Sequence, residues 1–213
     1  MIYDMQEACM YRNAKVYLVD DDEDICKSLT FLAESIGLEI ECYSNAKKFL
    51  ESYDSEKAGC LLLDVRMPGM SGLQLQEELK KRSSHKPIIF LTGHGDISMA
   101  VKAIKEGAYH FFTKPYNTQE LLDCINAAIE EDLKLKKRDY DSYAYEEKLA
   151  RLTPRESEIL EWVVVGKTSR AIAELLGISH KTVELHRNKL MEKMEVSSSV
   201  ELAALVYKNR QAH

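Results

Sequence analysis

The spacing of hydrophobic and polar positions changes once along the chain. In the first 133 residues, five short apolar runs recur at 16–19, 38–43, 60–63, 88–91 and 110–113. Between them, apolar side chains such as Ile25, Leu29 and Leu32 follow at intervals of three or four, which is typical of one face of a helix. Continuous apolar strands that alternate with helices predict a doubly wound α/β domain, in which a five-stranded parallel sheet is covered on both faces.

After residue 133 the strand pattern ends. Residues 134–151 are charged, contain several tyrosines and lack glycine and proline, so we interpret them as a linker that is helical in part. Thr153, Pro154 and Glu156 then match an N-terminal capping box with proline at the first helical position. Three further short helices are expected around 168–176, 179–194 and 198–207. The pattern therefore predicts two domains, at 14–133 and 152–213.

The length and the charge distribution are consistent with this division. A chain of 213 residues is long for one domain and sufficient for two. Residues 1–133 hold 14 basic and 23 acidic side chains, so the net charge of −6 originates in the first domain and does not argue against nucleic-acid binding by the second. No apolar run approaches the ~20 residues of a membrane-spanning helix, and residues 1–14 lack a basic signal-peptide start. We expect a cytoplasmic protein that does not enter a membrane.

The cysteines do not match a known framework. There are five, an odd number, and none forms a C-x-x-C pair. This disfavours both a disulfide framework and a zinc site. We expect them to be small buried hydrophobic residues: Cys9, Cys26, Cys42, Cys60 and Cys124.

Charged and hydroxyl side chains follow the predicted strands at their carboxyl ends. Asp20 and Asp21 come after the first strand, Asp64 after the third and Thr92 after the fourth, and Lys114 follows the fifth. In parallel sheets these ends meet at one edge, where ligands bind. Three carboxylates at one edge repel one another unless a hard cation such as Mg²⁺ binds there. A carboxylate beside such a metal can attack a phosphoryl group, while the lysine neutralises charge on the transferring oxygens.

A simpler interpretation applies to each of these residues singly. An aspartate at a strand end is most often a helix cap or a turn residue. Five matching positions at once argue against that for the whole set. For Asp22 and Glu23 the simpler interpretation holds, and we expect them to cap the following helix.

Four motifs around these positions carry a family resemblance. They are Val19-Asp-Asp-Asp-Glu23, Leu63-Asp-Val-Arg-Met-Pro-Gly-Met-Ser-Gly72, Leu91-Thr-Gly-His-Gly95 and Phe112-Thr-Lys-Pro115. In this order and spacing, over about 120 residues, the chain resembles the receiver domain of response regulators, which has a flavodoxin-like fold. The Lys114-Pro115 peptide resembles the cis-proline junction of that family.

The resemblance implies a role for each site residue. Asp64 would be the phosphoacceptor, and Mg²⁺ would be held by Asp20, Asp21, Asp64 and the backbone carbonyl of Arg66. Lys114 would pair with the phosphate. Two residues would form the switch, because Thr92 moves toward the phosphate and Phe111 is the aromatic that responds.

The second domain contains a helix-turn-helix pattern. A short helix from Thr168 ends at Gly177, and Ser179 starts a longer one. Ala171 and Ala173 are small enough for the two helices to cross closely. On the longer helix Val183, Leu190 and Met194 share one face, and the opposite face, available for a DNA major groove, carries Lys181, Glu184, Leu185 and Asn188.

The same domain also resembles a known family. Leu152-Thr-Pro-Arg-Glu-Ser-Glu-Ile-Leu160, Lys181-Thr-Val-Glu-Leu-His-Arg187 and Ser199-Val-Glu-Leu202 are similar to the LuxR-type domain of NarL/FixJ response regulators, over residues 152–208. The residues expected to contact DNA are Lys167, Arg170, Lys181, Thr182, Glu184, Leu185, Arg187, Asn188 and Lys189, of which Lys167, Arg170, Arg187 and Lys189 are candidates for phosphate contacts. The alternative is a four-helix protein-interaction domain with a solvated charged face.

Together these features predict a phosphorylation-controlled transcription factor rather than an enzyme. Its partners would be a sensor histidine kinase, double-stranded promoter DNA and, on phosphorylation, a second copy bound through the 97–112 face, with Met99, Val101, Lys102 and Lys105 as contacts. The 134–151 linker would tether the domains or hold the recognition helix inactive. Two other classes stay open: a haloacid-dehalogenase-type hydrolase that uses Asp20-Asp-Asp22, and an adaptor that keeps the receiver fold but is never phosphorylated.

Overall fold

The computed structural model describes residues 14–93 and 97–211. The chain divides into two compact units, with the boundary between Lys136 and Lys137. Within the described ranges, no helix is both long and apolar enough to cross a membrane.

The first unit is built on a five-stranded sheet. Its strands are Lys15–Val19 (β1), Glu39–Tyr43 (β2), Gly59–Asp64 (β3), Ile88–Thr92 (β4) and His110–Thr113 (β5). They lie in the order β2-β1-β3-β4-β5, and every neighbouring pair is parallel. The central strands β3 and β4 are buried along their whole length, which explains their unbroken apolar sequences. The predicted doubly wound parallel sheet is confirmed.

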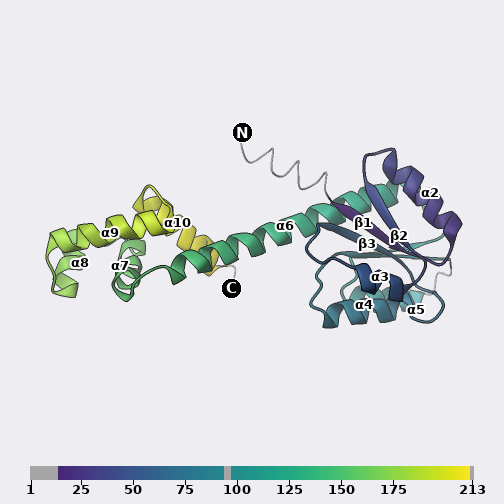
Figure 1. Cartoon of the computed structure of the whole chain (residues 1–213), viewed down its shortest axis with the longest axis horizontal. Coiled ribbons are helices and arrows are strands. Elements are labelled where there is room, and N and C mark those ends of the chain that lie inside the picture. Colours follow the sequence, from purple (N-terminus) through teal and green to yellow (C-terminus); the bar gives the residue numbers. More distant parts are fainter. Residues whose placement is uncertain (1–13, 94–96, 212–213) are drawn as a thin grey trace. The chain divides into compact units, whose positions relative to one another are not determined.

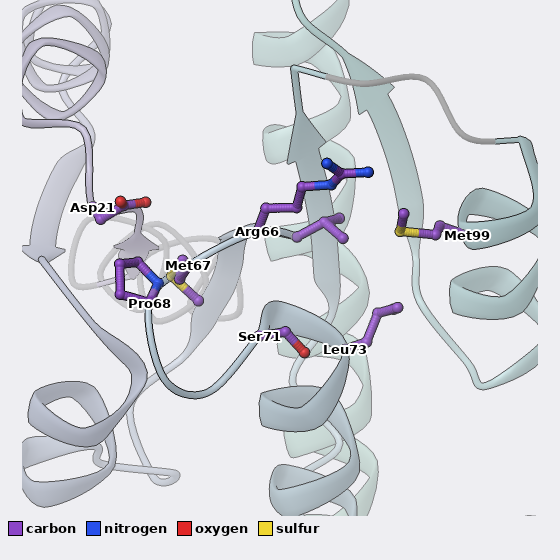
Figure 2. Close-up of a pocket in the computed structure, with 8 residues that line it drawn as sticks. Asp21, Arg66, Met67, Pro68, Ser71, Leu73 and Met99 are labelled. Carbon is purple, nitrogen blue, oxygen red and sulfur yellow. The ribbon is translucent and has the colours of Figure 1, made fainter.

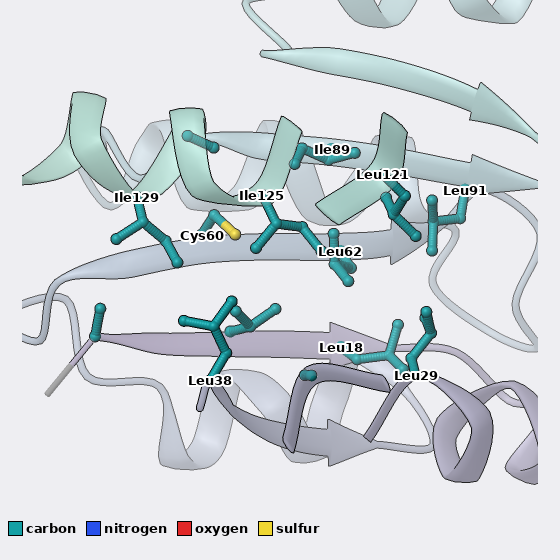
Figure 3. Packing of buried hydrophobic residues seen from close by; sticks show 14 of the residues in the cluster. Leu18, Leu29, Leu38, Cys60, Leu62, Ile89, Leu91, Leu121, Ile125 and Ile129 are labelled. Carbon is teal, nitrogen blue, oxygen red and sulfur yellow. The ribbon is translucent and has the colours of Figure 1, made fainter. Parts of the chain in front are cut away.

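Five helices cover the two faces of this sheet (Figure 1). They are Glu23–Glu34 (α2), Ala46–Ser52 (α3), Gly72–Lys81 (α4), Ile97–Lys105 (α5) and Thr118–Ala150 (α6). Helices α2 and α6 pack on one face, where Leu29 and Ile125 meet the strand residues Leu18 and Leu62 (Figure 3). Helices α3, α4 and α5 pack on the other face. Both faces of the sheet are thus covered, most completely at the central strands β3 and β4.

Local signals set where α2 and α4 begin. As expected, Asp22 caps α2: its side chain accepts hydrogen bonds from the amides of Asp24 (2.9 Å) and Ile25 (3.4 Å). Ser71 starts α4 in a capping box. The next residue must be Gly72, because a Cβ atom there would lie 2.2 Å from the carbonyl oxygen of Asp64. The glycine therefore lets α4 begin directly against the end of β3.

The segment 134–151, which the sequence predicted to be a linker that is helical in part, belongs almost entirely to one long helix. Helix α6 continues without a break from Thr118 to Ala150, over 33 residues. Its first part packs on the sheet through Leu121 and Ile129, and its last part supplies the buried Tyr145 to the core of the second unit. The absence of glycine and proline permits this continuity.

The second unit is helical, with α7 at Pro154–Val164, α8 at Ser169–Leu176, α9 at His180–Met194 and α10 at Ser199–Arg210. The predicted capping box is present, since Thr153 and Glu156 exchange hydrogen bonds at the start of α7. Gly177 ends α8 in the left-handed conformation at φ 62°, where glycine is favoured. One core cluster draws residues from all four helices and from the end of α6.

The cysteines depart from expectation at two positions. Cys26 of α2 and Cys42 of β2 form a disulfide, with their Cα atoms 6.2 Å apart. The prediction of purely hydrophobic cysteines is wrong for this pair, because the packing of α2 beside β2 brings together residues whose spacing in the sequence is not informative. Cys60 is buried and Cys124 half-buried, both as thiols. Cys9 lies outside the described residues.

Candidate functional site

Three charged side chains meet at the carboxyl edge of the sheet. The Lys114 Nζ donates hydrogen bonds to Asp20 Oδ2 (2.7 Å) and to Asp64 Oδ1 (3.1 Å). The three residues come from the ends of β5, β1 and β3, which are brought together only by the strand order. The two carboxylates are almost enclosed, with side chains 2% and 10% exposed, whereas the lysine is 20% exposed. The cluster is thus a buried acidic pair whose lysine is its most exposed member.

Backbone hydrogen bonds fix these side chains. The amide of Lys114 donates to the carbonyl of Thr92 (2.7 Å), after which the Lys114-Pro115 peptide is cis, as the family resemblance suggested. The amide of Arg66 donates to Asp64 Oδ2 (2.6 Å), and the amide of Asp22 donates to Asp20 Oδ1 (3.0 Å). The carboxylates are therefore held by main-chain donors from the loops that follow their own strands.

The charges of the site are unbalanced. Burial raises the pKa of Asp64, and the hydrogen bond from Lys114 only partly opposes this effect. Burial alone would lower the pKa of Lys114, but its hydrogen bonds to Asp20 and Asp64 outweigh burial, so this pKa is raised. One lysine faces two carboxylates, with the exposed Asp21 beside them. The site consequently favours a further positive charge.

Asp21 lies outside the hydrogen-bonded cluster. Its side chain is exposed and lines a pocket of about 550 Å³ next to the loop that follows β3 (Figure 2). The other lining residues are Val65, Arg66, Met67, Pro68, Ser71, Leu73 and Met99. In the described part of the chain, no three acidic, histidine or cysteine side chains lie close enough to form a metal-binding group. The structure thus brings Asp20 and Asp64 together around Lys114 and leaves Asp21 at the rim.

The two predicted switch residues lie on neighbouring strands. Thr92 is buried at the end of β4, and Phe111 of β5 is half-buried against Phe90, with ring centroids 6.3 Å apart. On α5, Val101 and Lys102 are exposed, and Lys102 pairs with Glu106 at 3.8 Å. Met99 is instead half-buried against the core. Lys105 is also exposed.

In the second unit, α9 has the two faces that the sequence predicted. Val183, Leu190 and Met194 are fully buried. The opposite face, exposed to solvent, carries Lys181, Glu184, Leu185, Asn188 and Lys189. Lys167 and Arg170, before and within α8, are exposed as well. Helices α8 and α9, with the residue before α8, thus present cationic and polar side chains on a surface that the core does not use.

Two of the candidate DNA-contact residues are engaged within the unit. Arg187 donates to the carbonyl of Lys167 (3.4 Å) and to Ser199 Oγ (2.7 Å), so its guanidinium joins α9 to the start of α10. The hydroxyl of Thr182 lies 2.8 Å from that of Ser179, the N-cap of α9. The helical pattern could not reveal the Arg187 contacts, because Lys167 and Ser199 lie outside α9, whereas the Ser179–Thr182 contact lies within the first turn.

Comparison with protein families assigns both units. Residues 16–126 match the response regulator receiver domain, and residues 150–206 match the bacterial regulatory proteins of the luxR family. The chain belongs to the response regulators of the NarL/FixJ family. It combines a receiver domain with a LuxR-type DNA-binding domain.

Individual relatives match along nearly the whole chain. The transcriptional regulatory protein TdiR of Thauera aromatica is 44% identical over 191 residues, which cover 90% of this chain and 84% of TdiR. The transcriptional regulatory protein FixJ of Azorhizobium caulinodans is 37% identical, over 92% of this chain and 93% of FixJ. Among solved structures, the response regulator StyR aligns with a TM-score of 0.86 and 40% identity, over 92% of this chain and 99% of StyR.

Proposed function

We propose that this response regulator accepts a phosphoryl group from a sensor histidine kinase on Asp64 and thereby controls transcription through DNA binding by α9. The observation that carries the proposal is the hydrogen-bonded cluster of Asp20, Lys114 and Asp64 at the open edge of the sheet. A buried carboxylate beside a lysine, in a family of receivers, is suited to phosphoryl transfer rather than to structure alone.

The transfer itself needs few groups. A carboxylate oxygen of Asp64 attacks phosphorus, an O–P bond forms, and the N–P bond to the donor imidazole breaks, so the imidazole nitrogen leaves with the electron pair. Lys114 and the main-chain amide beside Asp64 stabilise the negative charge on the phosphoryl oxygens. The acyl phosphate is later lost to water. The chain would thus act in single transfers and not as a multiple-turnover enzyme.

The donor chemistry of the site fits Mg²⁺. Its side-chain donors are carboxylate oxygens, the hard ligands that Mg²⁺ prefers, and they carry more negative charge than Lys114 neutralises. Asp20, Asp21 and Asp64, with the carbonyl of Arg66, are the residues that would hold the ion. When bound, it would neutralise phosphoryl oxygens and the acidic pair.

Transcription would be controlled through DNA binding by the helical unit. The outer face of α9 would enter the major groove of promoter DNA, while Lys167, Arg170, Lys181 and Lys189 would contact phosphates. Phosphorylation would draw the Thr92 hydroxyl inward, let Phe111 reorient and favour a dimer through the exposed side of α5. Two DNA-binding units in one dimer would bind a pair of half-sites more tightly than one alone. The site of action would be the cytoplasm.

One experiment tests phosphoryl uptake. The protein is incubated with acetyl phosphate and Mg²⁺, and its intact mass is measured over time. We expect one labile phosphate per chain on the wild type and none on Asp64→Asn, because the amide fills the same volume but is a poor nucleophile. The matched control Asp54→Asn changes an exposed aspartate before β3 and should retain full uptake.

The other outcomes identify the rival classes. Steady release of inorganic phosphate with no phosphoprotein would indicate a hydrolase that uses Asp20-Asp-Asp22. An unchanged mass with every donor tested would indicate an adaptor. Undiminished phosphate on Asp64→Asn would move the acceptor to another residue.

A further inference from the structure

A disulfide lies next to the acidic edge of the receiver. It joins Cys26, in the second turn of α2, to Cys42, the last residue but one of β2. Both residues are half-buried against the core between α2 and the sheet. The hydroxyl of Thr30 lies 3.6 Å from the Cys42 sulfur, which adds a polar contact to this otherwise apolar position.

The disulfide joins the two elements, α2 and β2, that contact the loop carrying Asp20 and Asp21. The loop leaves β1 and enters α2 at Asp22, whose carbonyl accepts the amide of Cys26 (3.2 Å). On the other side, the amide of Asp20 donates to the carbonyl of Tyr43 (3.1 Å), the neighbour of Cys42 in β2. Strand β2 in turn pairs with β1. The disulfide therefore connects the two supports between which the acidic loop 20–22 is held.

The other described thiols are poorly suited to oxidation. Burial raises the pKa of the Cys60 thiol well above its ordinary range, and burial raises the pKa of Cys124 to about 11. Thiols with raised pKa values supply little of the thiolate that reacts with oxidants or disulfides. Within the described residues, the Cys26 and Cys42 pair is the one whose geometry already permits a bond.

Contacts other than the disulfide also hold α2 and β2 in place. Strand β2 is held to β1 by a backbone ladder of five residue pairs, and α2 is held by its apolar face. A protein that works on DNA inside the cell meets a pool of reduced thiols, so the pair would ordinarily be open and would close under oxidation. This step rests on the proposed function.

We propose that Cys26 and Cys42 form a redox-active pair that sets how readily Asp64 takes up a phosphoryl group, by bracing the acidic loop 20–22. With hydrogen peroxide as oxidant, each thiol gives up one proton and one electron, the S–S bond forms, and the peroxide is reduced to two molecules of water. A dithiol reductant reverses the step by thiol–disulfide exchange. In the oxidised form the loop is ordered before the phosphodonor arrives, so less ordering is needed during the transfer.

The test compares oxidised and reduced full-length protein. Peptide mapping establishes the Cys26–Cys42 link after peroxide treatment and its loss after dithiothreitol. Amide hydrogen exchange is then measured over residues 20–26 in Mg²⁺-free protein, and the rate of phosphate uptake is measured with acetyl phosphate and Mg²⁺. We expect slower exchange in the oxidised form and uptake roughly threefold to tenfold faster, the gain expected from ordering one short loop.

Two variants control the comparison. Cys26→Ser with Cys42→Ser should keep the reduced behaviour in both treatments, whereas Cys124→Ser should keep the full redox response. Equal amide exchange and equal phosphate uptake in the oxidised and reduced wild type would refute the proposal that the disulfide orders loop 20–22. Failure of peroxide to form the Cys26–Cys42 link would also refute it. Phosphate on neither form would instead refute the proposed function, and with it any control of uptake.

Discussion

Two lysine–carboxylate clusters of the receiver unit have buried carboxylates; they lie at opposite ends of the strands of the same sheet and differ in how their charges are balanced. At the amino edge, Lys86 lies 3.8 Å from Asp132, with side chains 1% and 5% exposed. At the carboxyl edge, Lys114 contacts both Asp20 and Asp64 and keeps access to solvent. The same side-chain types thus form a closed pair at one edge and an open site at the other.

The closed pair satisfies its own polar groups. Asp132 accepts the amide of Gly59 (2.9 Å), and Lys86 donates to the carbonyl of Lys57. The Lys86 ammonium also lies 5.7 Å from the centroid of the Tyr17 ring. Burial lowers the pKa of Lys86, because the ammonium is almost wholly removed from water. The two opposite charges neutralise each other and have backbone hydrogen-bond partners, so this pair has no excess charge that would attract a ligand.

The open site lacks this balance. Two buried carboxylates share one lysine, and Asp21 adds a third negative charge at the rim. Such an arrangement is unfavourable for stability and favourable for binding a cation and a phosphoryl group. The comparison therefore predicts that changes at the amino edge affect stability and changes at the carboxyl edge affect ligand binding.

The largest expected effect is on the closed pair. Asp132→Leu leaves the Lys86 ammonium buried without a counter-charge, which should destabilise the receiver by about 3–5 kcal/mol. The measurement is the opening free energy of β3 from amide hydrogen exchange. The double variant Lys86→Met with Asp132→Leu should recover most of the loss, because no charge remains buried. A loss below about 1 kcal/mol in the single variant would contradict the closed-pair interpretation.

The open site should respond to Mg²⁺ and the closed pair should not. At ten times its dissociation constant, Mg²⁺ should stabilise the wild-type receiver by about 1.4 kcal/mol, since it binds the folded state alone. Asp20→Asn with Asp21→Asn should abolish this gain, measured from the same β3 amides. The variant Lys86→Met with Asp132→Leu should retain it. Equal stabilisation of all three proteins would place the ion elsewhere.

A third lysine–carboxylate pair, formed by Lys193 and the buried Glu156 in the helical unit, should make the stability of that unit depend on pH. Glu156 accepts from the Lys193 ammonium (2.6 Å) and the Thr153 amide (2.8 Å). Burial acts to raise the pKa of Glu156, but these donors outweigh it and lower the pKa to about 2 from an ordinary 4.5. Because the folded-state pKa is the lower one, the carboxylate stabilises the unit above about pH 4.5 and loses this contribution as the pH falls toward 2.

Urea unfolding followed by the fluorescence of Trp162 measures this effect, because the chain has one tryptophan and it packs against the core of the helical unit. Glu156→Gln should be less stable than the wild type at neutral pH, and the difference should shrink through the acid range. Glu158→Gln changes an exposed glutamate on the same helix and should show no such trend. A constant difference between Glu156→Gln and the wild type at every pH would argue against an ionised Glu156.

Features that depend on neighbouring residues in the sequence could be predicted, whereas contacts between distant segments could not. Apolar runs gave all five strands, and Thr153 with Glu156 gave the start of α7, because both signals lie within a few residues. Strand-end positions also indicated Asp20, Asp64 and Lys114, since parallel strands must end at one edge. Contacts between distant segments left no pattern, as for the Cys26–Cys42 disulfide and for the Lys86–Asp132 pair. The continuation of α6 to Ala150 was missed in part because its charged sequence has no single apolar face.

The smallest expected effect concerns charges that are exposed and whose partner would be DNA. Lys181 and Lys189 lie on the outer face of α9 and are open to solvent, unlike the buried Lys86. Lys181→Ala and Lys189→Ala should leave stability nearly unchanged and weaken DNA binding, because each phosphate contact releases a counterion. The slope of log affinity against log salt concentration should therefore fall in magnitude by about 0.9 for each contact removed.

Lys208→Ala provides the control for this measurement. It removes an exposed lysine that pairs with Asp141 at 2.8 Å, and the slope should stay unchanged. If the slopes of Lys181→Ala and Lys189→Ala also stay unchanged, the DNA-contact surface lies on another part of the helical unit, and exposure on α9 has no bearing on recognition.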